Sequence, residues 1–289
     1  MAAGGGAPPA EAMRGAKRVS AVIVVVIAII TFVAGLGLGY YVLAPAPPKA
    51  LTTLVLGTNT PFPPFEFYNS TTHKLQGFDI ELIQTILTRA GYAYEWRDFR
   101  DFQVLLSAVS AQGIDIGIGA ITENGATGTE RNLTLAFSDP YFLSNQGVLR
   151  RTSDTRTFCA NSADCTATEL NRTDLTIAVQ AITTSEFWVE DNLPAVVNAN
   201  HLSIFPDVSQ VLQALSSSSV DIVVIDKPAA DGIAAGNAAF SVEGTILTNE
   251  LYGFAVAHGD PLALLPKINS QLAGMRADGT YTQILNKWF

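Results

Sequence analysis

A stretch between Ile114 and Tyr141 carries the residue types that build an anion site. It begins as an apolar, β-prone run, passes at Ala120 and Thr122 into a polar loop with one cation, Arg131, and ends at a turn. Open α/β sheets bind ligands beyond the carboxyl ends of their strands. Because the planar guanidinium can donate two parallel hydrogen bonds to a carboxylate, we expect a buried strand followed by an anion-binding arginine. The alternative is a solvated surface arginine.

Two further strand ends carry polar side chains. Thr183 and Thr184 follow an apolar run that ends at Gln180 and precede a predicted helix, where backbone N–H groups and hydroxyls can hold an anion. Asp226 ends the apolar run VDIVVID, so its carboxylate is expected to face a cleft and to accept an ammonium group. Both positions have a structural alternative, because threonine and aspartate are also common helix N-caps.

Aromatic residues near these strand ends supply the remaining feature. Phe62 lies in a proline-rich loop and Phe102 at the start of a predicted helix. Both could form walls around a ligand, although aromatic side chains more often belong to the core. A carboxylate clamp, an ammonium acceptor and aromatic walls together are what a zwitterionic α-amino acid requires.

Charge and histidine content exclude other classes of site. The formal net charge is −9, and of the 26 acidic and 17 basic residues only Glu11, Arg14, Lys17 and Arg18 precede residue 19. The rest of the chain therefore carries 25 acidic and 14 basic residues, which argues against a nucleic-acid partner. The three histidines are scattered and show no metal-ligand spacing, so we expect no metal and no cofactor.

The amino-terminal region predicts a membrane anchor. Residues 1–20 read as a disordered cytoplasmic tail, and residues 21–44 are uncharged over more than the roughly 20 residues that cross a bilayer. Residues 45–50 form a proline-rich linker. The basic residues before the apolar segment place the remainder of the chain outside the membrane. Cleavage at Ala44-Pro45-Ala46 is the alternative and would release a secreted form.

Cys159 and Cys165 are the only cysteines and lie close together in a polar loop on the outward side. An oxidising compartment and this spacing favour one local disulfide. A reactive or metal-binding thiol is the rival interpretation, but it lacks a partner histidine.

From Leu51 onward, short apolar strands alternate with amphipathic helices in two blocks. The strands are expected at 53–58, 114–122, 175–180 and 220–226. Asp79 and Asp101 are predicted N-caps of two helices, and further helices are expected over 184–192, over 208–215 and after Pro228. This order implies an α/β fold of two lobes.

From about Leu54 to Phe289 the chain resembles the family 3 solute-binding proteins of ABC transporters, the polar amino-acid receptors with the type II periplasmic binding protein fold. The matching segments, in family order, are GTNTPFPPFEF (57–67), GFDIELIQTI (77–86), GIDIGIGAIT (113–122), TERNLTLAFSDPYF (129–142), IAVQAITTSE (177–186), VDIVVIDKPAA (220–230), YGFAVAHGDP (252–261) and MRADGTYTQILNKWF (275–289). The resemblance implies that residues 51–147 and 248–289 form lobe 1 and residues 148–247 form lobe 2, with ligand bound between them.

The resemblance also implies roles for individual residues. Arg131 matches the arginine that pairs with the ligand carboxylate, and Asp226 matches the acceptor of its ammonium group. The other expected ligand-binding positions are the strand-end residues Thr122 and Ala120, the lobe 2 threonines Thr183 and Thr184, the aromatic walls Phe62 and Phe102, and Asn59.

The chain departs from the family pattern at three positions. Thr122 and Arg131 are nine residues apart, where the family usually has five, so four residues appear inserted. Ile182 replaces the usual glycine, which restricts the backbone there. Asn59 stands where some receptors for cationic ligands carry aspartate, which removes one reason to favour a basic ligand. The sequence therefore puts the exact pocket in question.

The resemblance implies an extracytoplasmic receptor that captures an amino acid, delivers it to an ABC transporter permease and is not an enzyme. A second class remains open, because the same fold is similar to periplasmic cyclohexadienyl dehydratases, for which Glu66 is a candidate acid that could act on arogenate. A third class is a ligand-sensing ectodomain.

Overall fold

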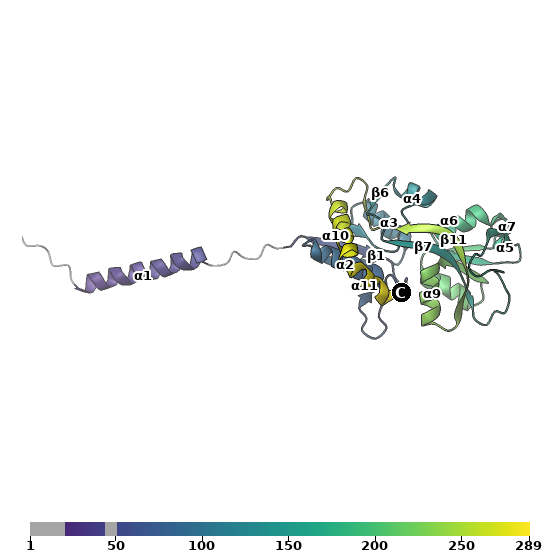
Figure 1. Ribbon diagram of the computed structural model, residues 1–289, viewed down its shortest axis with the longest axis horizontal. Helices are drawn as coiled ribbons and strands as arrows, with labels where there is room; N and C mark the ends of the chain where they lie inside the picture. The colour runs from purple at the N-terminus through teal and green to yellow at the C-terminus, as the bar shows by residue number, and fades with distance from the viewer. Residues whose placement is uncertain (1–20, 44–50) are drawn as a thin grey trace, which may run out of the picture. The chain divides into compact units, whose positions relative to one another are not determined.

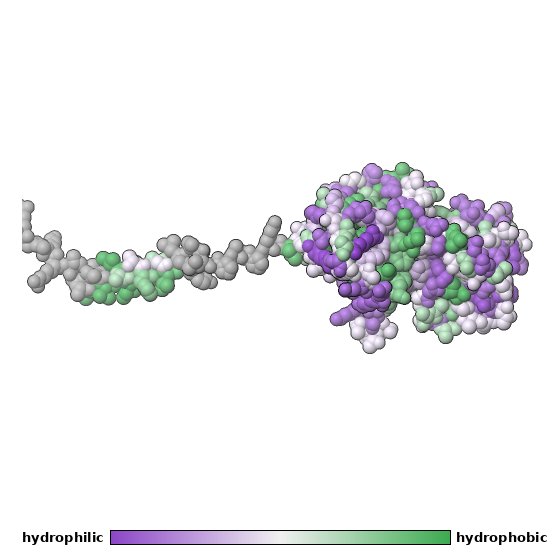
Figure 2. Space-filling view, viewed as in Figure 1, coloured by the Kyte–Doolittle hydropathy of each residue, from purple (hydrophilic) through white to green (hydrophobic). Residues whose placement is uncertain are grey.

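The structure is a computed structural model that describes residues 21–43 and 51–289, which form two separate units. In the first unit, helix α1 (Ala21–Leu43) has exposed apolar side chains at its described positions (Figure 2). Within the described residues, no helix is both long and apolar enough to cross a membrane. The transmembrane helix predicted over 21–44 is therefore not supported, and the predicted tail (1–20) and linker (45–50) lie outside the described residues.

The first lobe of the second unit is built on a five-stranded sheet. In spatial order, its strands are β4 (Ala93–Asp98), β1 (Thr53–Thr58), β5 (Ile116–Gly117), β12 (Ala255–Ala257) and β6 (Leu135–Phe137). β1 pairs in parallel with β4 and β5, whereas β12 runs antiparallel to β5 and β6. A separate hairpin joins β2 (Phe67–Tyr68) to β3 (Leu75–Gln76). The parallel strands β1 and β5 end at the same edge, which is where the candidate residues follow them.

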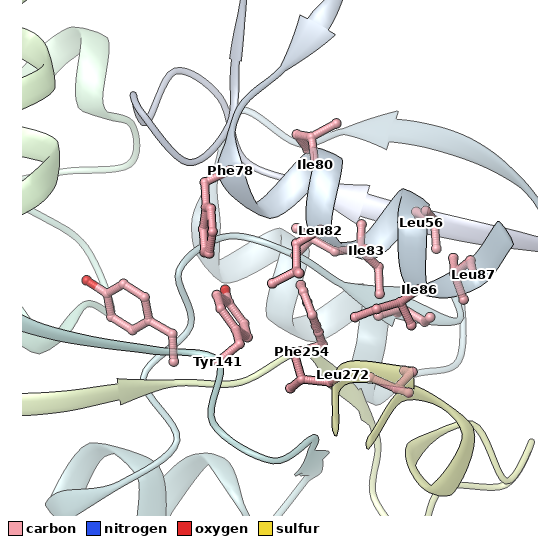
Figure 3. Close-up of a cluster of buried hydrophobic side chains, with 14 of the residues drawn as sticks. Leu56, Phe78, Ile80, Leu82, Ile83, Ile86, Leu87, Tyr141, Phe254 and Leu272 are labelled. Carbon is pink, nitrogen blue, oxygen red and sulfur yellow. The ribbon is translucent and has the colours of Figure 1, made fainter. Parts of the chain in front are cut away.

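Helices cover this sheet and bury its apolar side chains. They are α2 (Phe78–Arg89), α3 (Phe102–Ser110), α10 (Leu265–Ala277) and α11 (Thr280–Trp288). The short helix α4 (Gly125–Arg131) follows β5 in the chain and contributes no residue to the apolar clusters of this lobe. The predicted stripe of α2, including Ile80, Ile83 and Leu87, packs in one core with Leu56 and Phe254 (Figure 3). A second cluster is formed around α3. The sheet is therefore fixed between two apolar layers.

The second lobe contains another five-stranded sheet. In spatial order, its strands are β11 (Phe240–Tyr252), β7 (Phe142–Arg151), β10 (Ile222–Asp226), β8 (Ile177–Gln180) and β9 (Leu202–Phe205). β10, β8 and β9 are parallel, and β7 is antiparallel to both β10 and β11. The helices of this lobe are α5 (Ala167–Leu170), α6 (Thr184–Asn192), α7 (Pro194–Asn198), α8 (Val208–Ser216) and α9 (Lys227–Gly236).

Strand β10 shows why its sequence is a continuous apolar run. Ile222 and Val224 belong to one buried cluster, whereas Val223 and Ile225 belong to another that includes residues of α8 and α9. Successive side chains of a strand point to opposite faces, so a sheet covered on both faces needs apolar residues at every position. Such a strand can place a polar side chain only at its end, where Asp226 lies.

The amino- and carboxyl-terminal elements of the second unit pack together in one lobe, and the middle of the chain forms the other (Figure 1). The long strands β7 and β11 lie side by side between them and are paired along most of their length. This arrangement confirms the predicted two-lobed α/β fold. The boundaries expected from the sequence, 51–147 with 248–289 and 148–247, stay a prediction.

Several predicted elements agree with the structure. The strand expected over 53–58 is β1, and the helix expected over 184–192 is α6. Asp101 caps α3, since its carboxylate accepts hydrogen bonds from the N–H groups of Gln103 and Val104. The predicted disulfide is present between Cys159 and Cys165, whose Cα atoms are 5.0 Å apart.

The predicted capping role of Asp79 is wrong. Helix α2 begins two residues earlier than predicted, at Phe78, and its N-cap is Gly77. The φ of 138° at Gly77 and its close approach to Phe65 require glycine, because a Cβ would lie 2.0 Å from the Phe65 carbonyl oxygen. The Asp79 carboxylate is instead buried and accepts hydrogen bonds from the Tyr141 hydroxyl and the Ala120 N–H group.

The strand predicted over 114–122 is also too long, because β5 covers only Ile116–Gly117. Ala120 has a φ of 47°, and its N–H group donates to the Asp79 carboxylate at 2.9 Å. An N–H group used in this way is not available to a neighbouring strand. The chain consequently leaves the sheet before residue 120 and turns toward the other lobe.

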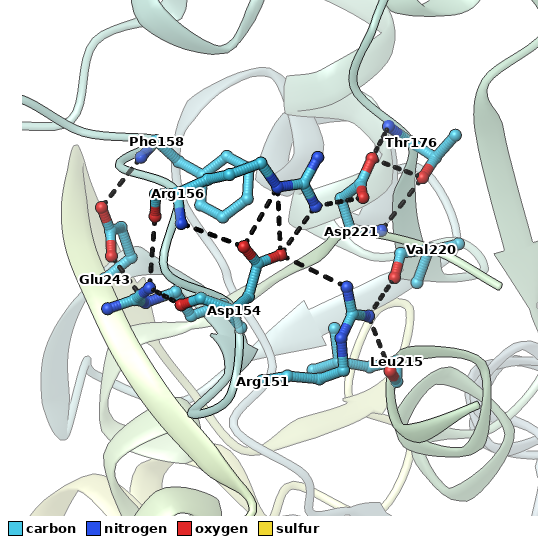
Figure 4. A network of polar contacts seen from close by, with 10 residues as sticks. Arg151, Asp154, Arg156, Phe158, Thr176, Leu215, Val220, Asp221 and Glu243 are labelled. Carbon is cyan, nitrogen blue, oxygen red and sulfur yellow. Dashed lines mark hydrogen bonds and ion pairs between the residues drawn. The ribbon is translucent and has the colours of Figure 1, made fainter. Parts of the chain in front are cut away.

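A network of charged residues fixes the disulfide-containing loop of the second lobe (Figure 4). Asp154 lies at its centre and pairs with Arg156 at 2.6 Å and with Arg151 at 3.3 Å. On the β11 side, Glu243 pairs with Arg150 at 2.7 Å and accepts a hydrogen bond from the Phe158 N–H group. The loop is thereby attached to both β7 and β11.

We predict that Asp154 contributes a pH-dependent part of stability. Hydrogen bonds from the Arg156 side chain lower the pKa of Asp154 to about 2. This contribution is full above the unfolded-state pKa of about 3.9 and is lost as the pH falls toward 2. In urea unfolding, Asp154→Asn should lower the midpoint most above pH 4, and the difference from wild type should shrink toward pH 2. The exposed acid Asp174 provides a matched control, and an equal pH profile for Asp174→Asn and Asp154→Asn would contradict the prediction.

Candidate functional site

A cavity of about 510 Å³, counting the space open at its mouth, lies between the two lobes. All nine residues predicted to contact a ligand line it: Asn59, Phe62, Phe102, Ala120, Thr122, Arg131, Thr183, Thr184 and Asp226. The structure thus brings these residues together, while their part in ligand binding stays a prediction.

Arg131 is carried to the cavity by the segment that looked like an insertion. This segment folds as helix α4, which ends at Arg131. The helix approaches the preceding chain closely at Gly128, where a Cβ would lie 2.1 Å from backbone atoms of Glu123. The chain leads away from Thr122, and helix α4 returns the Arg131 side chain to it. Arg131 Nη1 donates to the Thr122 carbonyl oxygen at 2.9 Å. The additional residues therefore do not displace the guanidinium from the cavity.

The Arg131 side chain is buried and held from both lobes. Nη2 donates to the Ile182 carbonyl oxygen of the second lobe at 3.1 Å, and the guanidinium carbon lies 5.4 Å from the ring centroid of Phe102. Burial lowers the pKa of Arg131 to about 10, against the opposing effect of Glu250 and Asp226, so the side chain remains a cation at neutral pH. Two of its five N–H donors are used by these carbonyls, and Nε has no partner within the described chain.

Asp226 faces the cavity from the end of β10, and the structural alternative of helix capping is not observed, because it makes no side-chain cap of α9. Its Oδ1 accepts a hydrogen bond from Gln146 Nε2 at 2.6 Å, and its Oδ2 accepts one from the Tyr252 hydroxyl. Burial raises the pKa of Asp226 to about 7, and the negative charge of Glu250 adds to the shift. Asp226 therefore binds a proton near neutrality unless a cation stabilises its charged form.

Gln146 and Glu250 form a buried link that the sequence did not reveal. Gln146 Nε2 donates to Glu250 Oε1 at 2.7 Å as well as to Asp226, and Gln146 Oε1 accepts from the Ser185 hydroxyl at 2.7 Å. Glu250 Oε2 accepts from the Thr122 hydroxyl at 2.8 Å. Asp226 of the second lobe is thereby connected, through Gln146 and Glu250, to Thr122 of the first lobe.

The two threonines of the second lobe take different positions. Thr183 is the N-cap of α6, as the structural alternative predicted, and its hydroxyl also donates to the Gln180 carbonyl oxygen at 2.6 Å. The Thr184 hydroxyl donates across the cleft to the Thr122 hydroxyl at 3.1 Å. Thr184 thus touches the first lobe directly, whereas Thr183 shapes the start of the helix.

The remaining predicted residues form the opposite wall. Asn59 Nδ2 donates to the Phe99 carbonyl oxygen at 2.6 Å, and Asn59 Oδ1 accepts from Gln180 Nε2 of the second lobe at 3.0 Å. Phe62 is partly buried and packs against cores of both lobes. The lobes are thus joined at the cavity by the contact of Asn59 with Gln180 and by that of Thr122 with Thr184, and Phe62 packs against both lobes.

Ile182 has a backbone conformation that its residue type disfavours. Its φ is 61°, in the left-handed region, which is costly for a β-branched residue. Neighbouring hydrogen bonds hold it there, because its N–H group donates to Glu186 and its carbonyl oxygen accepts from Arg131. The sequence analysis expected isoleucine to restrict the backbone at this position, and the positive φ shows the consequence as local strain.

Comparisons with known proteins agree with this architecture. A model of the bacterial extracellular solute-binding proteins, family 3, matches residues 54–289. The chain is 26% identical over 242 residues to the L-cystine-binding protein TcyJ of Escherichia coli (strain K12), which covers 83% of this chain and 84% of the relative.

Two solved structures extend the comparison. One is an ancestral arginine-binding protein bound to arginine, at 33% identity and a TM-score of 0.70, with 82% of this chain and 98% of the other covered. The other is the ancestral amino acid-binding protein AncCDT-1, described as a precursor of cyclohexadienyl dehydratase, at 30% identity and a TM-score of 0.69, with 82% and 95% covered.

We predict that glycine at position 182 stabilises the protein relative to alanine. Ile182→Ala and Ile182→Gly remove the same contacts beyond Cβ, but only glycine adopts a φ of 61° without steric cost. Ile182→Gly should exceed Ile182→Ala by about 1 kcal/mol in the free energy of unfolding, measured by urea titration. A more stable alanine variant would show that the position is not strained.

Proposed function

Because the chain belongs to the bacterial extracellular solute-binding proteins, family 3, we propose that it captures an amino acid between its lobes and delivers it to an ABC transporter permease. The carrying observation is that Arg131 and Asp226 face one interlobe cavity from opposite lobes. The guanidinium suits an α-carboxylate, and the carboxylate suits an α-ammonium group.

Cross-lobe contacts support capture by closure. Several hydrogen bonds join the lobes around the cavity, among them Arg131 to Ile182, Thr184 to Thr122 and Gln180 to Asn59. Closure excludes water from the ligand and strengthens its charge pairs, because the effective dielectric constant falls. In this proposal, residues 51–147 and 248–289 move against 148–247, and the paired strands β7 and β11 act as the hinge.

The family places the protein outside the cytoplasm. The finer part of our localisation proposal is that residues 21–44 retain the receptor at the membrane, an expectation that comes from the sequence alone. Cell fractionation should then recover the protein with membranes, and mass spectrometry should find the uncleaved amino terminus. A soluble form that begins after residue 44 would replace the anchor with a cleaved leader.

A dehydratase is the second candidate. Glu66 lines the cavity, and burial raises its pKa well above the usual range, which favours the protonated form that an acid catalyst needs to donate a proton to a leaving hydroxyl. The similarity to the described precursor of cyclohexadienyl dehydratase is compatible with this candidate. The binding function is favoured, because the arrangement of Arg131 and Asp226 needs no catalytic step.

We predict that at least one amino acid stabilises the protein in a thermal-shift screen and that Arg131 is required. A ligand at about one hundred times its dissociation constant should add roughly 2.7 kcal/mol. Arg131→Ala should cost about 2–5 kcal/mol of binding free energy, because the ligand carboxylate loses its buried partner.

Arg97→Ala is the control, since Arg97 is largely exposed and does not line the cavity. If no amino acid shifts the melting temperature, or if Arg131→Ala binds as wild type, the binding proposal is wrong. Turnover of arogenate or prephenate, included in the same screen, would favour the enzyme instead.

A further inference from the structure

Glu66 is a buried acid that faces the cavity and is not used by the carboxylate clamp or the ammonium acceptor. Glu66 is only 1% exposed, and its Oε2 has no hydrogen-bond partner within the described residues. Oε1 lies beside the cavity-lining Gly119, 3.7 Å from the position that a Cβ on this glycine would take. A buried polar atom without a partner is costly, so the site favours a ligand that supplies one.

The surroundings of Glu66 disfavour its negative charge. Burial raises the pKa of Glu66 well above the usual range, and the carboxylates of Asp79 on α2, Asp226 at the end of β10 and Asp98 on β4 add to this. Tyr141, which precedes β7, also interacts with Glu66. All of these groups are acids, so a cation brought by a ligand would be the counter-charge that ionised Glu66 lacks.

The two protonation states of Glu66 suit different ligand groups. A neutral carboxyl donates its O–H to a carbonyl oxygen, such as that of a side-chain amide, whereas a carboxylate accepts hydrogen bonds from an ammonium or guanidinium group. If Arg131 and Asp226 take the α-carboxylate and α-ammonium, as the proposed function has it, Glu66 is left to meet the ligand's side chain.

We propose that Glu66 selects the ligand side chain through a single proton: the neutral acid takes a side chain with a carbonyl oxygen, and the carboxylate takes a cationic one. This inference rests on the proposed function and deepens it. When a cationic amino acid enters the protonated site, the Glu66 proton passes to solvent and the ligand's charge replaces it. When an uncharged amide or ureido side chain enters, the proton stays on the carboxyl group.

Arginine and citrulline are the matched probes for this proposal. They share the α-carboxylate and α-ammonium and nearly the same shape, but arginine ends in a cation and citrulline in a neutral ureido group. Because Arg131 and Asp226 meet the same α-groups in both, their own titration cancels in the ratio of the two dissociation constants. The ratio therefore reports the charge of Glu66.

The experiment is isothermal titration of the full-length protein with each probe between pH 5.5 and 8.5. The preference for arginine over citrulline should increase with pH, by up to about tenfold per pH unit over the range in which Glu66 is protonated in the citrulline complex and ionised in the arginine complex. Titration in two buffers of different ionisation enthalpy should show proton release with arginine and less release with citrulline. In Glu66→Gln, the ratio should become independent of pH and the difference in proton release should disappear.

Asp79→Asn is the matched control, because Asp79 is equally buried and lies near Glu66 but does not line the cavity. Since Asp79 raises the pKa of Glu66, its removal should keep the pH dependence and move it to lower pH. A ratio that does not change with pH in wild type, or a Glu66→Gln variant with the wild-type profile, would overturn the inference. Should Glu66→Gln fail to fold, the wild-type pH profile and proton release still decide.

Failure of this inference is distinct from failure of the proposed function. If another amino acid binds but neither probe does, selection by Glu66 is wrong and amino-acid capture stands. If no amino acid binds at all, the proposed function itself fails.

Discussion

The rest of the structure depends on one constraint: charged side chains are buried between the two lobes, out of contact with water, and each needs a partner there. Arg131 is buried together with Asp226 and Glu250, and charged groups in such a place are stable only when they are paired and held by hydrogen bonds. Each lobe supplies part of that set, so neither lobe alone completes it. The fold can be understood as two rigid sheets that bring these groups to one position.

The strands that join the lobes also carry the electrostatic link between them. Gln146 lies on β7 and Glu250 on β11, and the amide of Gln146 holds the carboxylates of Asp226 and Glu250 at hydrogen-bond distance. A change in the angle between the lobes must therefore act on the same hydrogen bonds that position Asp226. The relative position of the lobes and the position of the Asp226 carboxylate are therefore linked through the Gln146 side chain.

The sequence predicted the parts of the site that follow from strand ends. Asp226 ends an apolar strand covered on both faces, which leaves its polar side chain no place except the cleft. The function of Asp79 was missed because a helix-start aspartate looks the same whether it caps or is buried. Gln146 and Glu250 were missed because their partners are distant in sequence: Gln146 and Glu250 are 104 residues apart, and Glu250 and Thr122 are 128 residues apart. Polar residues within otherwise buried strands were the available signal.

Helix α4 contributes to two separate features, the cation in the cavity and the lining of a second groove. Its Arg131 end is fixed at the cavity by the hydrogen bond to the Thr122 carbonyl oxygen, while Ala126 and Glu130 on its body line a second groove with residues of α6. Side chains on the body can thus be exchanged without moving the guanidinium. The shape of the outer groove and the position of the cation are therefore set by different residues of one short helix.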